Sequence, residues 1–254
     1  MSGIDYLPIE AARAATGLRV AFTQGVPNPW GFGARAILDI KRIPYLAVAQ
    51  EAGGANDALK AWTGQTSAPV AMLDDERPRA LWSEIVVLAE QLAPEPPLVP
   101  AVPEERALMF GLCHELCGDD GLGWNARTLI FAANRAAGND AFESMYRKYS
   151  SPSPVEHARR RVADILGLLD RQLAAQTARG RDYLVGDRLS AADLYWAGFS
   201  NLFVAMAPDL CAMPDFYRAL GAITCGHLSP PVPSRLLDHR DRVVRDHLDT
   251  PVAF

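Results

Sequence analysis

A helix start at residues 186–194 constrains the fold of this chain more than any other stretch. The sequence Gly-Asp-Arg-Leu-Ser-Ala-Ala-Asp-Leu leads there into an apolar segment that extends to Met206. Ser190 is placed to accept a hydrogen bond from the Asp193 N–H, while the Asp193 carboxylate reaches back to the Ser190 N–H as in a capping box. Because the segment that follows is apolar on nearly every side, we expect a structural helix that is buried all round at the centre of a domain.

Length and composition indicate a soluble protein of one or two domains. The chain has 254 residues, 49% of them hydrophobic, and a net charge of −5 with scattered basic residues, which argues against a nucleic-acid partner. No apolar run approaches the roughly 20 residues that span a bilayer, and the first 17 residues contain no apolar signal-peptide core. The four cysteines do not suggest a disulfide framework. We therefore expect a cytoplasmic protein with no membrane partner.

The N-terminal half alternates between strand and helix patterns after a leader over residues 1–16. Leu18–Phe22 alternates with the period of a strand, and the loop that follows places Asn28 as the N-cap and Pro29 in the first turn of a helix. Further elements are predicted at 45–49 (strand), 56–62 (helix), 68–73 and 79–82 (strands), and from Ser83 onward (helix). The pattern predicts a small sheet covered by helices.

A proline-rich connector separates this half from a helical one. Residues 94–103 contain five prolines, which excludes a helix and favours a stiff, extended linker. Helical patterns then follow at 104–117, 124–137, 141–149, 154–175, 191–206 and 214–223, and a polar tail is expected to form a last helix on the bundle. We predict three units: an α/β domain over 17–93, the linker over 94–103, and an all-α domain over 104–254.

The string at 186–194 and the order of elements together resemble the glutathione transferase superfamily over nearly the whole chain. The implied fold is an N-terminal thioredoxin-like domain followed by a C-terminal helical bundle. Tau- and omega-class members have a catalytic Ser or Cys followed by Pro and an aromatic residue, and thirteen residues later a lysine-containing turn into the second strand. Here Asn28-Pro29-Trp30 and Lys41 stand at that spacing. The resemblance therefore implies that Asn28 is the catalytic residue and that Trp30 contributes to glutathione binding.

Two further positions carry the predicted glutathione site. The resemblance implies that the Ala68–Pro69 bond is cis and that the Ala68 backbone pairs with the cysteinyl part of glutathione, although a proline at a strand start is equally explained as an edge residue. Trp82 and Ser83 stand where family members have Glu or Gln and then Ser, which hold the γ-glutamyl carboxylate. A helix N-terminus is a general anion site, but Ser83 is equally explained as a plain N-cap.

Asn28 departs from the Ser or Cys of the resembled classes, so its chemistry has to be worked out separately. Lowering a thiol pKa from about 8.5 by two units requires about 2.7 kcal/mol. A hydrogen bond to the anion contributes roughly 1.5–3 kcal/mol and a helix N-terminus about 0.3–1. We expect the Asn28 amide, together with the Trp30 and Gly31 N–H groups, to supply that sum. Thiol–disulfide chemistry at this position is excluded, because Asn has no thiol.

Other constellations indicate packing more strongly than chemistry. Cys113 and Cys117 share a helix face but have no second pair at zinc spacing, so we expect packing thiols and no metal. The histidines at 157, 227, 239 and 247 lie in polar surroundings and are expected to face water. Five aromatic residues are core residues or the lining of an apolar second-substrate pocket: Trp124, Phe131, Tyr146, Tyr149 and Phe199.

The leading functional hypothesis is an enzyme that activates the glutathione thiol for attack on an electrophilic or apolar small-molecule substrate. Glutathione is then a co-substrate, and the resemblance implies a homodimer. The alternative is a glutathione transferase fold kept for binding or scaffolding without turnover. The residues at 28 and 82 favour this alternative, whereas the intact capping box is neutral, because fold does not imply function.

Overall fold

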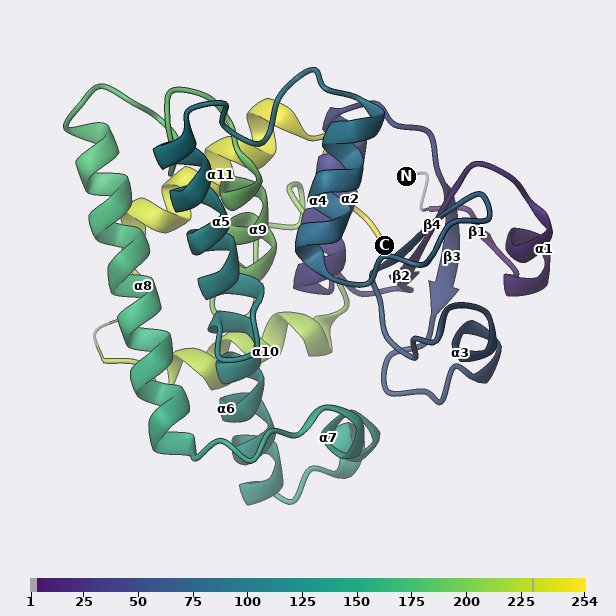
Figure 1. The fold of residues 1–254 in the computed structure, drawn as a ribbon. Coiled ribbons are helices and arrows are strands. Elements are labelled where there is room, and N and C mark those ends of the chain that lie inside the picture. The colour runs from purple at the N-terminus through teal and green to yellow at the C-terminus, as the bar shows by residue number, and fades with distance from the viewer. Residues whose placement is uncertain (1–3, 230) are drawn as a thin grey trace.

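The computed structural model describes residues 4–229 and 231–254 and contains a mixed four-stranded sheet (Figure 1). The strands are β1 (Tyr6–Leu7), β2 (Leu18–Thr23), β3 (Leu46–Gln50) and β4 (Val70–Leu73), in the spatial order β1-β3-β2-β4. β3 pairs in parallel with β1 and β2, whereas β4 runs antiparallel to β2. Every residue of β2 is buried, because helices cover both faces of the sheet.

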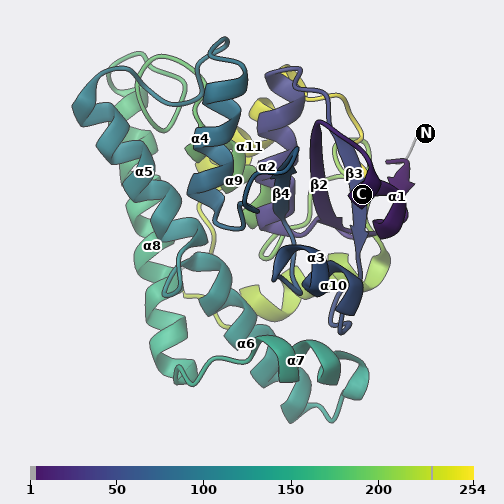
Figure 2. The same cartoon turned by 45° about the vertical axis from the view of Figure 1, so that its right-hand side comes forward.

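Helices lie on the two faces of the sheet in separate layers. On one face, α1 (Ile9–Ala14) and α3 (Asp57–Thr63) bury Ala12 and Leu59 against β2, β3 and β4. On the other face, α2 (Pro29–Ile40) and α4 (Trp82–Leu92) pack against each other and separate the sheet from the remaining helices (Figures 1 and 2). This arrangement confirms the predicted thioredoxin-like architecture.

Two expectations for this half are wrong. Of the expected leader, residues 1–3 lie outside the described part of the chain, but Tyr6–Leu7 joins the sheet as β1 and α1 packs behind it. Residues 79–82 form no strand: Arg79 makes a single bridge to Ala71, and α4 already begins at Trp82. Ser83 is therefore the second residue of α4 and not its N-cap. The Glu84 carboxylate supports this helix start by accepting from the Ala80 and Leu81 N–H groups.

The second half of the described chain is helical, as predicted. Its helices are α5 (Pro103–Cys117), α6 (Leu122–Ala136), η1 (Asp140–Phe142), α7 (Glu143–Tyr149), α8 (Val155–Thr177), α9 (Ala191–Ser200), α10 (Asp215–Cys225) and α11 (Ser234–His247). α9 contacts α2, α5 and α11, so it joins the two halves. Among residues 4–229 and 231–254, none of the helices combines the length and apolar character needed to cross a membrane.

A buried polar cluster fixes the start of α9. The Asp193 carboxylate, fully buried, accepts hydrogen bonds from the Ser190 N–H (2.9 Å), the Ser190 hydroxyl (2.7 Å) and the Leu184 N–H (2.8 Å). A fourth partner is His239 Nε2 of α11, at 2.9 Å. The expectation that His239 faces water is therefore wrong: it is only 4% exposed, because this contact offsets the cost of burying the ring.

α9 ends earlier than the apolar pattern predicts. Every residue of the helix is buried, as expected, but the helix ends at Ser200 and not at Met206. The next turn tightens, with the Leu202 N–H bonded to the Phe199 carbonyl and the Phe203 N–H to that of Ser200. The Asn201 side chain then accepts from the Met206 N–H, which holds the turn in a non-helical path.

The proline-rich segment 94–102 contains no helix or strand and is held by Lys41. The Lys41 ammonium is buried, donates to the Ala93 and Pro96 carbonyls at 2.7 and 2.9 Å, and lies 2.7 Å from the Glu90 carboxylate. Because Lys41 follows α2 directly, this contact ties the connector to the helix that begins at Asn28.

Candidate functional site

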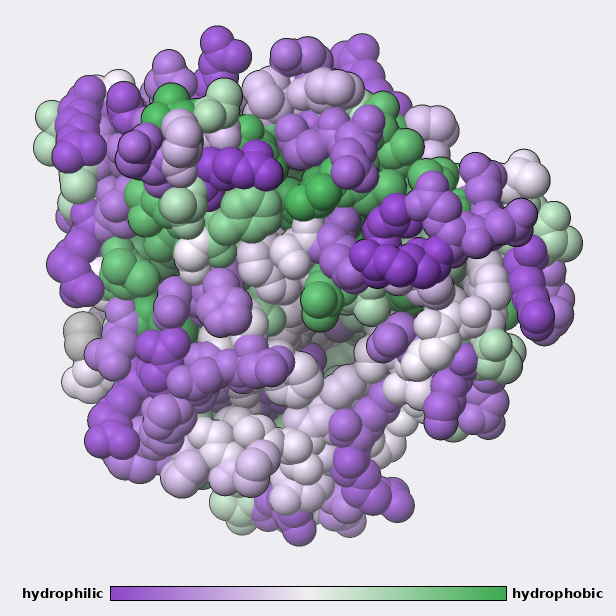
Figure 3. Space-filling model, viewed as in Figure 1, coloured by the Kyte–Doolittle hydropathy of each residue, from purple (hydrophilic) through white to green (hydrophobic). Residues whose placement is uncertain are grey.

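A cavity of about 300 Å³ lies between the carboxyl end of β2, the N-terminus of α2 and the helical half. It is visible as a hollow between the two halves of the surface (Figure 3). Its walls are mainly apolar, with contributions from Val26, Pro29, Ile130, Phe131, Met145 and Leu202. A few polar side chains converge in it, which is the usual composition of a small-molecule site.

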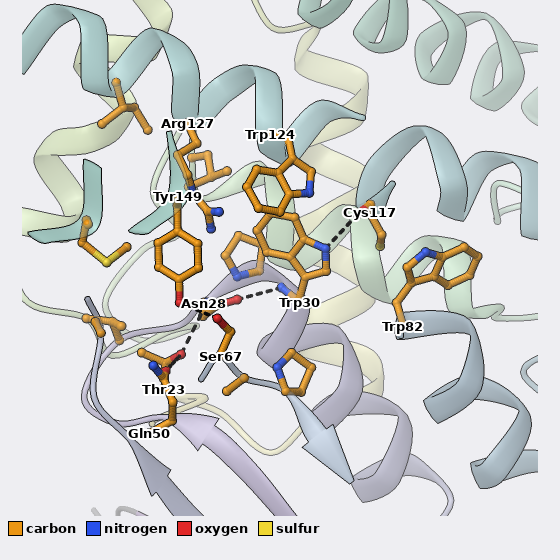
Figure 4. A pocket seen from close by; sticks show the side chains of 18 of the residues that line it. Thr23, Asn28, Trp30, Gln50, Ser67, Trp82, Cys117, Trp124, Arg127 and Tyr149 are labelled. Carbon is orange, nitrogen blue, oxygen red and sulfur yellow. Dashed lines mark hydrogen bonds between the residues drawn. The ribbon is translucent and has the colours of Figure 1, made fainter. Parts of the chain in front are cut away.

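Asn28 lies at the N-terminus of α2 and caps it, as predicted. Its Oδ1 accepts from the Trp30 N–H at 3.1 Å and the Gly31 N–H at 3.4 Å (Figure 4). The two backbone amides expected to assist a thiolate are thus bonded to Asn28 itself. Its Nδ2 makes only a long contact, 3.4 Å, to the Thr23 hydroxyl. The side-chain NH₂ group is therefore the donor that Asn28 presents near the cavity.

Thr23 and Gln50 form a polar floor beneath Asn28. The buried Thr23 hydroxyl donates to Gln50 Oε1 at 2.8 Å, and Gln50 Nε2 donates to backbone carbonyls including that of Thr66. Both side chains line the cavity from the ends of β2 and β3. Sequence reasoning missed them. The available signal was that a polar residue ends each of two adjacent parallel strands, whose carboxyl ends share one edge of the sheet.

The predicted glutathione-binding residues are divided between two places. Ala68, Pro69 and Trp82 line the same cavity as Asn28, and the Ala68–Pro69 peptide bond is cis, as the resemblance implies. Ser83 instead lines a second hollow, on the outer side of α4, together with Arg77 and Glu84. The side chains of the Trp82–Ser83 pair therefore do not meet in one site.

Trp30 lies in the cavity wall, where its position is fixed by the helical half. Its indole Nε1 donates to the Cys117 carbonyl at 2.9 Å, and its ring packs edge-on against Phe199 and Trp124. Its indole N–H is thus already used. Of the five aromatic residues considered as pocket lining, Trp124, Phe131 and Tyr149 line the cavity, whereas Tyr146 and Phe199 do not.

α7 closes one side of the cavity by contacting loops of the sheet domain. The Tyr149 hydroxyl lies 2.8 Å from the Ser67 hydroxyl, next to Ala68 (Figure 4). The Lys148 ammonium donates to the carbonyls of Gly54, at 2.8 Å, and Thr66. A side chain at Gly53 would meet Ser144, so the approach of α7 to this loop is close.

Arg127 of α6 places a cation in this apolar wall. Its guanidinium carbon lies 4.7 Å from the ring centroids of Trp124 and Tyr149 and 5.0 Å from that of Trp30. Burial lowers the pKa of Arg127 to about 10, so the side chain is still charged at neutral pH. Sequence reasoning missed Arg127, because a single Arg three residues after Trp124 on a helix has no distinguishing local pattern.

Comparisons with known proteins identify the fold. Residues 134–218 match the family model described as the glutathione S-transferase C-terminal domain. The fold is similar to a glutathione S-transferase from Methylobacterium radiotolerans in complex with glutathione sulfonate (20% identity, TM-score 0.61, 94% of this chain and 97% of that chain covered). Residues 134–218 therefore correspond to the glutathione S-transferase C-terminal domain family, and the chain as a whole has the glutathione transferase fold.

Other glutathione transferase structures give the same result. A family member from Pseudomonas fluorescens, with two glutathione molecules bound, shares 16% identity with a TM-score of 0.62, covering 96% of this chain and 98% of that chain. A glutathione S-transferase from Methylobacillus flagellatus with glutathione bound shares 16% identity with a TM-score of 0.62, covering 91% of this chain and 99% of that chain. A comparison with curated proteins found no match. The tau- or omega-like subtype stays a prediction.

Two buried cysteines lie on α5, and one of them, Cys117, lines the cavity that Asn28 also lines. Cys113 and Cys117 are free and buried in the helical core, and burial raises the pKa of both thiols. Cys117 contributes its carbonyl to the Trp30 contact, and its thiol stays protonated at neutral pH. Within the described residues, no group of three His, Cys, Asp or Glu side chains is arranged to hold a metal ion.

Proposed function

We propose that the cavity binds glutathione and that the chain activates its thiol for attack on an electrophilic or apolar co-substrate. The observation that carries this proposal is the convergence of the Asn28 amide, at the N-terminus of α2, with the Ala68–Pro69 strand entry in one cavity of about 300 Å³. In this proposal the cysteinyl part of glutathione lies along Ala68, with its sulfur towards Asn28. The glutathione that is bound in two of the similar structures supports the assignment.

The γ-glutamyl end is assigned to the start of α4. The first N–H groups of a helix have no partner within the helix, and its dipole favours an anion there. In this proposal the Trp82 and Ser83 backbone N–H groups receive the γ-glutamyl carboxylate, and the Trp82 side chain flanks it from the cavity wall. The Ser83 hydroxyl contributes less, since its side chain lines the outer hollow.

The donors available to the sulfur limit how strongly it is activated. Because Asn28 Oδ1 takes the Trp30 and Gly31 N–H groups, the thiolate receives one hydrogen bond from Asn28 Nδ2, worth about 1.5–3 kcal/mol. The helix N-terminus adds about 0.3–1 kcal/mol. Their sum brackets the roughly 2.7 kcal/mol needed for a two-unit shift of the thiol pKa. Asn28 accepts no proton, so the thiol proton leaves to water, and we expect modest turnover.

The second candidate function is glutathione binding without turnover. It is favoured by one observation, the pairing of both helix amides with Asn28 Oδ1 instead of leaving them for a sulfur. The two functions differ in the rate of conjugation and agree in the affinity for glutathione.

Substitutions at Asn28 separate the two functions. Asn28→Asp keeps an oxygen to cap α2 but replaces the NH₂ donor with a second anionic oxygen, so the thiolate is destabilised while the helix is not. Conjugation of glutathione to 1-chloro-2,4-dinitrobenzene should fall tenfold or more in kcat/KM, as it should in Asn28→Ala. The pKa of bound glutathione, followed by the ultraviolet absorbance of its thiolate, should rise.

Asn28→Ser is the matched control, because it keeps both an N-cap oxygen and a hydroxyl donor, and we expect it to retain activity. Both candidate functions require that the wild type binds glutathione, which calorimetry measures. An unchanged rate in Asn28→Asp removes Asn28 from the mechanism, and binding with no conjugation by the wild type selects the second function.

A cytoplasmic homodimer is part of the proposal. Exposed apolar side chains occur around α4 and the first half of α5, where Figure 3 shows apolar residues at the surface. The exposed fractions lie between 38 and 62% for Leu81, Val87, Leu92 and Leu108. Apolar surface of this kind favours contact with another protein surface. Light scattering coupled to size exclusion should give twice the chain mass of 27.6 kDa, and a monomeric mass would remove the dimer from the proposal.

A further inference from the structure

Arg127 carries a charge that nothing in its surroundings neutralises. Among residues 4–229 and 231–254, no carboxylate forms an ion pair with it, and no hydrogen bond from its guanidinium is present. Three aromatic rings surround the guanidinium carbon at 4.7–5.0 Å instead. Placing a charge in an apolar wall is costly unless it is paired, so an unpaired cation lining a cavity calls for a ligand.

The geometry of the guanidinium indicates what kind of ligand fits. Aromatic rings interact with the faces of a guanidinium, whereas its N–H groups lie in its plane and need acceptors there. Figure 4 shows Arg127 directed from α6 into the space beside Tyr149 and Trp30. A planar carboxylate entering that space can receive two parallel hydrogen bonds from the fork, which a neutral group cannot match.

Neighbouring polar groups do not fulfil this role. The Tyr149 hydroxyl is bonded to that of Ser67, and the Tyr217 hydroxyl donates to the Pro27 carbonyl at 2.9 Å. Asp119 is the one carboxylate among the described lining residues, and it is exposed at the cavity rim without an ion pair to Arg127. The Arg127 N–H groups are therefore available to an acceptor on a molecule in the cavity.

We propose that Arg127 binds a carboxylate on the co-substrate, so that the chain prefers electrophiles with an acidic group attached to an apolar or aromatic body. The inference rests on the proposed function for the reaction itself. Trp124 and Phe131 supply the apolar contact for the body, and Arg127 fixes its acidic end within the cavity that Asn28 also lines. Arg127 is thus a residue that determines specificity, while Asn28 acts on the sulfur.

A matched pair of probes isolates the charge. In 4-chloro-3,5-dinitrobenzoate and in its methyl ester, the thiolate sulfur forms a bond to the ring carbon that carries chlorine. The C–Cl bond then breaks, and chloride leaves with the electron pair. The two probes share this step and differ in the carboxylate. A third probe, 3,5-dinitrobenzoate, has no leaving group and reports binding alone, through quenching of the fluorescence of Trp30 and Trp124.

Arg127→Met removes the charge and keeps an apolar stem, whereas Arg127→Lys keeps the charge without the planar fork. Arg135→Met is the control, since Arg135 is an exposed residue of the same helix that lies 4.1 Å from the Tyr146 ring and does not line the cavity. Circular dichroism and thermal unfolding establish that each variant is folded, and calorimetry measures its affinity for glutathione.

The expected result is that Arg127→Met weakens binding of 3,5-dinitrobenzoate tenfold or more, equivalent to about 1.4 kcal/mol. The same variant should lower kcat/KM for the benzoate by a similar factor and leave the ester within about twofold, while Arg127→Lys falls between and Arg135→Met is unchanged. Equal losses for benzoate and ester overturn the proposal, as does a loss of glutathione affinity in Arg127→Met, which would assign the cation to glutathione.

Failure of the proposed function gives a different result. If the wild type conjugates neither probe but binds 3,5-dinitrobenzoate in a manner that depends on Arg127, the carboxylate site stands without the reaction. If the wild type conjugates the ester and does not bind 3,5-dinitrobenzoate, the reaction stands and the carboxylate site is refuted.

Discussion

Replacing Asp193 with alanine should strongly destabilise the folded chain. Four hydrogen bonds converge on this fully buried carboxylate, from the Leu184 N–H, the Ser190 N–H and hydroxyl, and His239 Nε2. These hydrogen bonds connect the loop before α9, the N-cap residue of α9, and α11. Asp193→Ala removes the common acceptor and leaves all four donors in a buried space.

The magnitude follows from the number of donors that cannot find another partner. A buried donor left without an acceptor costs about 1–3 kcal/mol. The Ser190 hydroxyl can rotate towards another acceptor, and one water can enter the vacated volume. At least two of the four donors then stay unsatisfied, so we expect a loss of about 4 kcal/mol. That is a large part of a typical unfolding free energy of about 5–15 kcal/mol.

Urea unfolding followed by circular dichroism at neutral pH measures this loss. Asp187→Ala is the matched control, because Asp187 is an exposed aspartate in the same loop, and its removal should change the unfolding free energy by less than about 0.5 kcal/mol. Asp193→Asn should cost nearly as much as alanine, since its NH₂ group faces N–H donors. A loss below about 1 kcal/mol in Asp193→Ala would refute the reasoning that these four contacts hold α9 and α11 together.

Three further predictions follow from buried groups. Burial raises the pKa of the Cys113 and Cys117 thiols in the folded chain, so the unfolded chain releases these protons first as pH rises. The contribution of these thiols to stability is therefore complete below the ordinary thiol pKa of 9.0. Above that pH, the unfolding free energy measured in urea should fall by about 1.4 kcal/mol per pH unit for each thiol. A chromogenic disulfide reagent should react quickly with Cys225 alone in the native protein, because it is the one partly exposed thiol of the four, and with all four in denaturant; two or more fast thiols would contradict the buried assignments. Lys41→Met should cost about 2–3 kcal/mol in urea unfolding, since it leaves two connector carbonyls and the Glu90 carboxylate without their cation, whereas Glu90→Gln should cost less; equal costs would mean that the carbonyl contacts contribute nothing.

The sequence predicted the parts of the fold that short-range patterns specify. β2, β3, β4 and most helices of the second half lie where hydrophobic periodicity placed them. Asn28 caps α2 and Asp193 reaches back to Ser190, because a cap involves residues within one turn of each other. The glutathione transferase architecture was implied by the resemblance that the string at 186–194 and the order of these elements carry together.

The errors occurred where a distant partner decides the outcome. β1 is two residues long and exists because β3, about forty residues later, offers it a free edge. His239 stands in a polar stretch that predicts exposure, yet its ring is buried because Asp193 of α9 is there to accept from it. Neither partner can be identified from the local pattern.

The candidate site shows the same division. The sequence by itself determined Asn28 at the mouth of α2 and the proline entry to β4, since these depend on local backbone chemistry. Only the tertiary structure decided that Arg127 is a cavity residue, because its surroundings are assembled from α2, α6 and α7. Hydrogen bonds within a turn are determined by neighbouring residues. The desolvation of a charge depends instead on which segments, far apart in the chain, come to surround it.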